Sequence, residues 1–325
     1  MHSEPNVATR RGDAAMVADV QAGLVDRAPG VQRELPPKYF YDHRGSQLFE
    51  AITRLPEYYL TRTERLLLST LMPEWMDILR PGALVELGAG NADKTRTILD
   101  AMRAARDEVV YVPVDVSAAF LDETAHHLRR EYPDLRVEPV VADFAAGVRL
   151  PRGLPRPILY AFLGSTIGNL EDSEATELLT QLRHGMAPDD RLLLGADLVK
   201  DVAVIEAAYN DSKGVTAEFN RNMLRVLNHE LGADFDSTAF AHRAFFSERA
   251  GRIEMHLVAL ADQVVTIPGV ARFTVPAGDS IRTEISNKYT PRRLTRILAA
   301  AGLRPVTWET DDAGGYALLL TAPVP

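Results

Sequence analysis

Three acidic residues in the middle of the chain stand where they could hold a nucleotide. Two of them end apolar runs, and the third lies inside such a run. The first run, ALVELG, contains Glu86 and passes into a turn with Gly88 and Gly90, followed by Lys94. Glycines in such a turn let the backbone approach a ligand closely. Dinucleotide sites add a third glycine, in the pattern G-x-G-x-x-G, next to the pyrophosphate; Asp93 occupies that position here. The loop therefore favours a ligand without phosphates, such as S-adenosylmethionine (SAM).

The next two apolar runs also end in acids. Asp115 closes VVYVPVD, where a carboxylate can accept hydrogen bonds from both ribose hydroxyls. Asp143 closes VVADF, where it could accept from an adenine amino group while Phe144 flanks the ring. Each residue has a structural alternative: Asp115 could interact with a helix dipole, and Phe144 could be an ordinary core aromatic. Polar groups at three successive run ends favour the ligand.

A fourth apolar run ends in FLGSTIGNL, at the edge where a substrate would meet the cofactor. Gly164 and Asn169 follow this run, and the Asn169 amide offers two donors and an acceptor. The alternative is a glycine turn in which Asn169 caps the next helix. Ser165 is not in a G-x-S-x-G motif, which argues against a hydrolase.

The elements that must position these residues alternate along the chain. Short runs rich in Val, Leu and Ile lie between helical patterns at 94–105, 118–131 and 172–186, and earlier helical patterns cover 14–25, 46–53 and 62–78. Strands that alternate with helices of this length predict a parallel sheet covered on both faces. We therefore expect a doubly wound α/β core over about residues 63–198, with ligands outside the carboxyl ends of its strands.

The pattern changes after residue 200. Helical patterns at 202–211 and 215–231 precede the segments HRAFFSE, RIEMHLVAL, DQVVTI and ARFTV, whose period-2 alternation predicts an antiparallel sheet. A helix at 291–301 and the runs RPVTWET and GYALLLTA could then complete the α/β sheet. A chain that leaves such a core and returns to it indicates an inserted α+β domain.

Composition narrows the function classes. The chain has 325 residues with a formal net charge of −9, which argues against a general nucleic-acid binder. It has no cysteine, so disulfides and thiolate nucleophiles are excluded. No apolar run approaches the roughly 20 residues of a membrane helix, and the N-terminus does not resemble a signal peptide. None of the eight histidines forms an H-E-x-x-H motif. We expect a cytoplasmic protein with no metal, no membrane partner and no nucleic-acid partner.

Six motifs together resemble the histidine-specific Nα-methyltransferases of ergothioneine biosynthesis: LPEYYLTRTE, VELGAGNADKTR, FLGSTIGNL, GVTAEFNRN, RIEMHL and TEISNKY. The resemblance extends from about residue 35 to residue 320. It implies SAM-dependent trimethylation of the α-amino group of L-histidine to hercynine, by a monomer. It also implies a Rossmann-type class I methyltransferase domain (63–198 and 288–325) with an inserted α+β substrate-binding domain (1–62 and 199–287).

The resemblance also implies roles for individual residues. Cofactor-binding positions of the family fall on Gly88, Lys94, Asp115, Asp143 and Phe144, beside Glu86 and Gly90 of the same loop. Substrate-binding positions fall on Tyr58, Asn169, Tyr209, Glu284 and Ser286, with Gly164 next to them. Asn169 and Tyr209 would hold the carboxylate, whereas Tyr58, Glu284 and Ser286 would face the imidazole. Tyr41 would lie near the amine, which makes Tyr41 and Asn169 the catalytic candidates, and Met255 would line the pocket.

Local reasoning leaves alternatives open for the substrate residues. Glu284 and Ser286 lie two apart on one strand face and could read an imidazole, but they could equally form an exposed polar stripe. A lone tyrosine is more often a core aromatic with a satisfied hydroxyl. Asn287 should point to the opposite strand face and receives no role. Other readings are an N-methyltransferase of tryptophan or tyrosine, an NAD-dependent oxidoreductase, and a catalytically silent binding protein.

Overall fold

The structure is a computed structural model that describes residues 11–28, 30–143 and 147–324. Contacts between Cα atoms divide the chain into two compact units. The larger unit comprises Glu50–Asp211, Phe246–Ile253 and Ile285–Pro325, and the smaller unit comprises Met1–Phe49, Ser212–Phe245 and Glu254–Glu284. The domain limits expected from the sequence stay a prediction.

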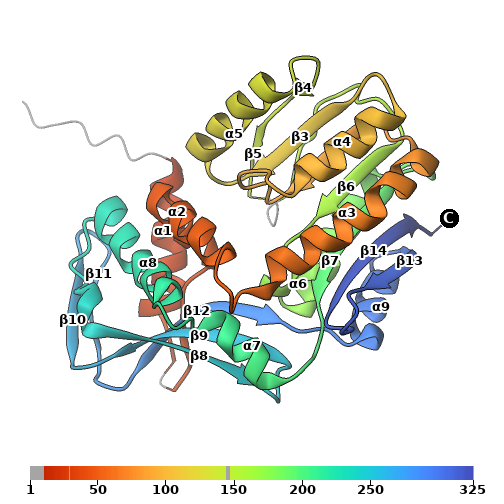
Figure 1. The fold of residues 1–325 in the computed structure, drawn as a ribbon. Coiled ribbons are helices and arrows are strands. Elements are labelled where there is room, and N and C mark those ends of the chain that lie inside the picture. Colours follow the sequence, from red (N-terminus) through yellow and green to blue (C-terminus); the bar gives the residue numbers. More distant parts are fainter. Residues whose placement is uncertain (1–10, 29, 144–146, 325) are drawn as a thin grey trace, which may run out of the picture. The chain divides into compact units, whose positions relative to one another are not determined.

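An eight-stranded sheet forms the centre of the larger unit (Figure 1). Its strand order is β13-β14-β7-β6-β2-β3-β4, and β5 also pairs with β3. The strands from β2 to β7 run parallel, whereas β14 is antiparallel to both β7 and β13. The bounds are β2 Ala83–Leu87, β3 Val110–Asp115, β4 Arg136–Val137, β5 Val140–Val141, β6 Ile158–Phe162, β7 Arg191–Asp197, β13 Leu303–Thr310 and β14 Tyr316–Pro323.

Helices cover both faces of this sheet, with α3 and α4 on one face and α6 and α9 on the other (Figure 1). Leucines of α6 and α9 join one core cluster with alternate residues of the parallel strands, such as Val85 and Leu87. Strands buried on both faces explain the continuous apolar runs of the sequence. The helices of this unit are α3 Tyr59–Leu79, α4 Thr95–Ala105, α5 Ala118–Glu131, the 3-10 helix η4 Thr166–Asn169, α6 Asp172–Gly185, α7 Val202–Tyr209 and α9 Pro291–Ala300.

The predicted Rossmann-type α/β fold is confirmed, with one local difference. The run RVEPVVADF forms two short strands rather than one, because Pro139 between them has no N–H to donate to a ladder. Asp143 therefore lies two residues beyond the end of β5. Strand β2 lies between β3 and β6, so the chain order reverses beside β2. Ligands of open α/β sheets bind at such a reversal, outside the carboxyl ends of the strands.

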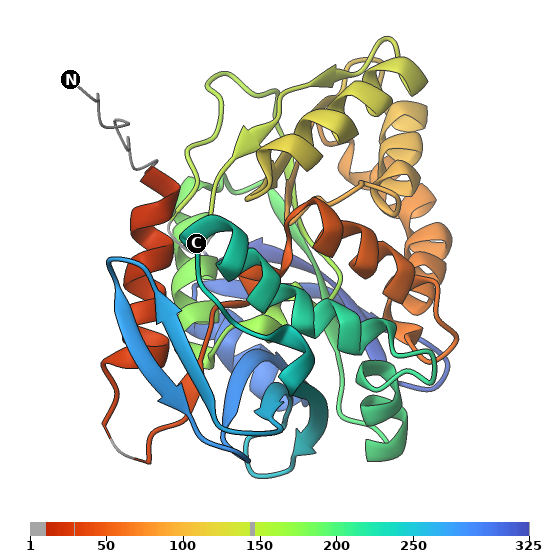
Figure 2. The same cartoon turned by 90° about the vertical axis from the view of Figure 1, so that its left-hand side faces the viewer.

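A second sheet has four strands in the order β1-β12-β9-β8, and β10 and β11 form an antiparallel hairpin. Most residues of these strands belong to the smaller unit, whereas Phe246–Ile253 and Ile285–Asn287 belong to the larger one. Strand β1, which the sequence analysis did not predict, pairs parallel to β12. Figure 2 shows the hairpin in blue, and its strand β11 contacts η1. The elements are α1 Arg11–Val20, the π-helix η1 Gln21–Val25, β1 Arg33–Glu34, the 3-10 helix η2 Pro37–Phe40, α2 His43–Thr53, α8 Val215–Leu231, the 3-10 helix η5 Ser237–Ala239, β8 Phe240–Ser247, β9 Arg252–Ala259, β10 Gln263–Ile267, β11 Ala271–Val275 and β12 Ser280–Asn287.

A buried amide fastens α8 to the sheet of the smaller unit. Asn220 of α8 donates to the backbone oxygen of His256 at 3.0 Å, and its Oδ1 accepts from Thr283 Oγ1 at 2.6 Å. These bonds join α8 to β9 and β12 in a region without water access, so the helix is held at a defined register. Within the described part of the chain, no helix has the length and apolar character needed to cross a membrane.

Candidate active site

The glycine turn after β2 is tied to the end of β3. Gly88 and Gly90 both have a positive φ, 69° and 53°, which glycine adopts without strain. The Gly90 N–H donates to Asp115 Oδ2 and the Ser117 N–H donates to Asp115 Oδ1, both at 3.1 Å. A Cβ built on Gly90 would meet no atom within 4 Å, so there is open space beside the turn. The Asp115 carboxylate is thereby held at the edge of that space.

This arrangement fits a nucleoside such as that of SAM. A carboxylate has about four lone-pair sites, and the two backbone N–H groups use one on each oxygen of Asp115. Each oxygen keeps capacity for one more donor, which matches the two hydroxyls of a ribose. The site that Asp115 forms with the glycine turn can therefore hold this cofactor.

Glu86 lies beneath the turn and is almost completely buried. Its Oε2 accepts hydrogen bonds from Thr95 Oγ1 at 2.7 Å and from the Tyr111 hydroxyl at 2.5 Å. Burial raises the pKa of Glu86 to about 7, against the lowering effect of these two bonds. The contacts indicate that Glu86 supports the cofactor loop by joining β2, β3 and α4.

Lys94 forms an ion pair with Glu64 of α3, a residue that the sequence analysis missed. The Glu64 carboxylate is fully buried and also accepts from the Gly164 N–H at 2.8 Å and from the Tyr316 hydroxyl at 2.6 Å. It therefore joins the start of α4 to the carboxyl end of β6, at the strand-order reversal. One signal was present: Glu64 lies four residues after Leu60 and three before Leu67, on the apolar face of its helix.

The 3-10 helix η4 places Asn169 beside the end of β12. The structure records no hydrogen bond from the half-buried Asn169 amide to the described residues, so its donors are available to a substrate. Asn287 holds the helix in place by donating to the backbone oxygens of Gly168, at 3.1 Å, and Leu170, at 2.8 Å. A Cβ on Gly168 would lie 3.0 Å from the Asn287 backbone oxygen, so this close approach requires glycine. Asn287, which was expected to have no role, thus positions the Asn169 segment.

Three of the predicted substrate residues come together in the larger unit. The Tyr209 hydroxyl donates to Ser286 Oγ at 2.8 Å, and the rings of Tyr58 and Tyr209 meet edge to face with centroids 6.3 Å apart. The hydroxyls of Tyr209 and Ser286 also accept hydrogen bonds from Lys288 Nζ, which lies 3.0 Å from the first and 2.9 Å from the second. Sequence reasoning missed Lys288, which directly follows β12 and lies two residues after Ser286.

Tyr41, Met255 and Glu284 belong to the smaller unit, where the Tyr41 ring packs against Phe49 and Phe219 with centroids 5.7 Å away in both cases. Met255 is buried in β9 and Glu284 is half-buried in β12. Phe144 lies outside the described residues, and Asp143 next to it is half-buried. The described residues contain no group of three or more acids and histidines that could hold a metal ion.

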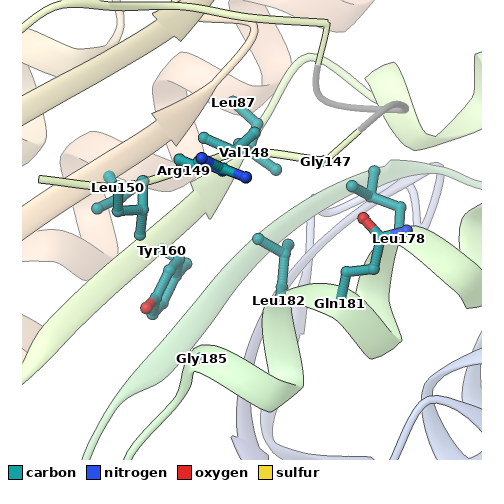
Figure 3. A pocket seen from close by; sticks show the side chains of 11 residues that line it. Leu87, Gly147, Val148, Arg149, Leu150, Tyr160, Leu178, Gln181, Leu182 and Gly185 are labelled. Carbon is teal, nitrogen blue, oxygen red and sulfur yellow. The ribbon is translucent and has the colours of Figure 1, made fainter.

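A cavity of about 310 Å³ in the larger unit is separate from these clusters (Figure 3). Residues of β2, β6 and α6 line it together with the segment 147–150, and Tyr160 and Leu182 point toward it. None of the predicted site residues lines this cavity. The predicted site residues and this cavity are therefore different parts of the larger unit.

Comparison with known proteins gives consistent matches over nearly the whole chain. A family model described as "Histidine-specific methyltransferase, SAM-dependent" matches residues 16–323. The histidine N-alpha-methyltransferase of Mycobacterium tuberculosis is 46% identical over 314 residues, which cover 96% of each chain. The protein of the same name from Mycolicibacterium smegmatis is 45% identical over 308 residues, or 94% of each chain. Ergothioneine biosynthesis protein 1 of Neurospora crassa is 31% identical over 299 residues, which cover 88% of this chain and 33% of the fungal protein.

Proposed function

This chain belongs to the family of histidine-specific, SAM-dependent methyltransferases, and on this premise we propose that it trimethylates the α-amino group of L-histidine. The product is the betaine hercynine, and the reaction is the first step of ergothioneine biosynthesis. The observation that carries the proposal is the 46% identity to a histidine N-alpha-methyltransferase over 96% of the chain. The clusters at the strand ends of the larger unit support it, because they match the residue types that such a reaction needs.

The cofactor side of the proposal rests on Asp115, the glycine turn, Lys94 and Asp143. When bound, SAM supplies a methyl group on a positively charged sulfur that leaves as a neutral thioether, so the chemistry needs no acid at the leaving group. Asp115 holds the ribose hydroxyls, and Gly88 and Gly90 let the backbone approach. Lys94, fixed by its ion pair with Glu64, closes the other side of the loop. Asp143 and Phe144 are proposed for the adenine.

For the substrate, we assign the two ends of histidine to different side chains. Asn169 and Tyr209 hold the carboxylate: the Asn169 amide donates to it, and the Tyr209 hydroxyl donates to it in place of Ser286 Oγ. Tyr58, Glu284 and Ser286 face the imidazole, and Met255 lines the pocket. A Cβ on Gly164 would lie 3.4 Å from both Lys94 Nζ and Thr166 Oγ1, so a larger residue at this position would crowd the Lys94 ammonium.

The methyl acceptor must be a neutral amine, although a typical α-amino group has a pKa of about 7.7–8.0. The residues must hold its lone pair roughly 3 Å from the methyl group. We propose that the proton leaves through the Tyr41 hydroxyl or to water. Exchange of Tyr41 for Phe should slow at least one of the three methylations, measured as the accumulation of mono- and dimethylhistidine. Unchanged rates for all three steps would exclude a role for this hydroxyl.

The test of the function is a mass-spectrometric assay with purified protein, SAM and a mixture of all free amino acids. Gains of one, two and three methyl groups on histidine alone are expected. Methylation of tryptophan or tyrosine would agree with SAM as the cofactor but would refute the proposed role of Glu284, because a carboxylate suits an imidazole better than a large apolar ring. Absence of methylation with SAM bound would refute the proposed acceptor. The monomeric state, the cytoplasmic location and the domain limits remain predictions.

A further inference from the structure

Lys94, at the strand-order reversal, has hydrogen-bond donors that its recorded partner does not use. It forms an ion pair with Glu64, and the two side chains are 20% and 0% exposed. An ammonium has three donors. Among the described residues, the structure records only Glu64 Oε2 as an acceptor for Lys94 Nζ. Two donors of a partly exposed cation therefore remain for a ligand.

The Glu64 carboxylate holds this ammonium in place. Its Oε1 accepts from the Gly164 N–H at 2.8 Å and from the Tyr316 hydroxyl at 2.6 Å, so the carboxylate is fixed to the end of β6 and the start of β14. A lysine side chain is a flexible four-carbon stem. The ion pair restrains that stem beside Gly164, where a Cβ would lie 3.4 Å from Lys94 Nζ. The ammonium is therefore positioned before a ligand binds.

The strand order indicates which part of SAM reaches Lys94. Strand β2 lies between β3 and β6. The residues proposed for the ribose and the adenine, Asp115 and Asp143, follow β3 and β5, on the β3 side of β2. The sulfur and the amino-acid part of SAM must then extend toward β6, where Lys94 is held. The carboxylate is the only anionic group of SAM, and it is the group that matches an ammonium with unused donors.

We propose that Glu64 is a positioning residue that holds the Lys94 ammonium for the carboxylate of SAM. This inference rests on the proposed function, which places SAM at the cofactor loop. Glu64 is fully buried and acts only through Lys94. With the ribose held at Asp115 and the carboxylate at Lys94, both ends of the sulfur-bearing chain are fixed. The methyl group on the sulfur is thereby oriented for transfer.

A neighbouring ion pair offers a matched control. Arg65, the next residue of α3, pairs with Asp93, the residue that precedes Lys94. The two pairs therefore join the same helix to the same loop. The side chains of Arg65 and Asp93 are 49% and 57% exposed, so water can replace this interaction. Arg65→Met should leave the affinity for the cofactor within about twofold.

The experiment compares two probes by calorimetry. S-adenosylhomocysteine keeps the carboxylate of the cofactor, whereas methylthioadenosine lacks the whole amino-acid part. For Glu64→Gln, which has nearly the same shape but no charge, the Kd of S-adenosylhomocysteine should rise about tenfold. The Kd of methylthioadenosine should stay within about twofold. A general loosening of the cofactor loop would instead weaken both probes.

Variants at Lys94 test whether Glu64 acts through this residue. Lys94→Met should also weaken S-adenosylhomocysteine about tenfold. It should leave decarboxylated SAM unchanged or bound more tightly, because the variant removes a cation and this probe has no carboxylate to lose. Combining Glu64→Gln with Lys94→Met should cost less than about twofold beyond Lys94→Met alone, since residues that act as one unit are not additive.

Glu64→Asp keeps the test decisive if Glu64→Gln does not fold. This variant keeps the charge but withdraws the carboxylate by one methylene, and should weaken S-adenosylhomocysteine at least about threefold with methylthioadenosine unchanged. A change of less than threefold for S-adenosylhomocysteine, or an equal loss for the two probes, would overturn the inference. If the unmodified protein neither binds S-adenosylhomocysteine nor methylates histidine, the proposed function fails. If it does both and the variants at Glu64 bind like it, only this inference fails.

Discussion

Exchange of Asn287 for Ala tests whether the segment that carries Asn169 depends on one buried amide. The side chain donates to the backbone oxygens of Gly168 and Leu170 and accepts from Arg293 Nη2 at 2.8 Å. A net contribution of about 1 kcal/mol for each hydrogen bond gives a loss of about 3 kcal/mol in the free energy of unfolding. Because the unfolding entropy is about 2.1 cal/mol/K per residue, this loss should lower the melting temperature by about 4 °C in a chain of 325 residues.

The same exchange should weaken histidine binding. If the looser η4 costs the hydrogen bond from Asn169 to the substrate its net contribution of about 1 kcal/mol, the KM for histidine rises about fivefold. Calorimetric melting and steady-state kinetics with saturating SAM measure the two effects. The KM for SAM should stay within about twofold, because Asn287 does not contact the cofactor loop.

A matched control is Gln263→Ala, since this half-buried side chain also donates two hydrogen bonds to backbone oxygens, and both bonds are exposed to solvent. This exchange should change the free energy of unfolding by less than about 0.5 kcal/mol, because water replaces the lost hydrogen bonds. Asn287→Asp keeps the acceptor for Arg293 but turns a carboxylate toward two carbonyl oxygens, and should destabilise at least as much as Ala. A melting temperature within 1 °C of the unmodified protein, together with an unchanged KM, would refute the reasoning.

The remaining predictions concern the support of the cofactor loop. Burial raises the pKa of Glu86 to about 7, so the folded protein keeps a proton that the unfolded chain releases above about pH 4.5. The stability that this group contributes is therefore lost as pH rises toward 7. Between pH 4.5 and pH 8, the free energy of unfolding measured by urea titration should fall by about 3 kcal/mol less for Glu86→Gln than for the unmodified protein. An identical pH dependence for the two proteins would contradict this. Gly195→Ala should destabilise by at least about 3 kcal/mol, because its Cβ would lie 2.0 Å from Glu64 Oε1 and 2.7 Å from the Tyr316 hydroxyl. The control Gly185→Ala, whose Cβ would meet only Tyr160 at 3.8 Å, should be nearly neutral, and equal effects would show that Glu64 moves aside.

The elements were predictable because their signals are local. Helix α5 covers 118–131 and α8 covers 215–231, as the periodicity indicated, and the Val- and Leu-rich runs became strands buried on both faces. The position of Asp115 at the carboxyl end of its strand was also predictable, because the apolar run VVYVPVD ends there. The motifs of TEISNKY and FLGSTIGNL indicated the family before any geometry was known.

The sequence by itself therefore determined the α/β fold, the family and the edge of the sheet where the cofactor loop stands. Only the tertiary structure decided which partner each polar side chain has. The bond from the Gly164 N–H to Glu64 joins residues 100 positions apart, and the one from Tyr209 to Ser286 joins residues 77 apart. Such pairs depend on strand order and on the packing of α3 and α7, which no local pattern specifies. For this reason Glu64, Asn287 and Lys288 became visible only when the strands and helices were in place.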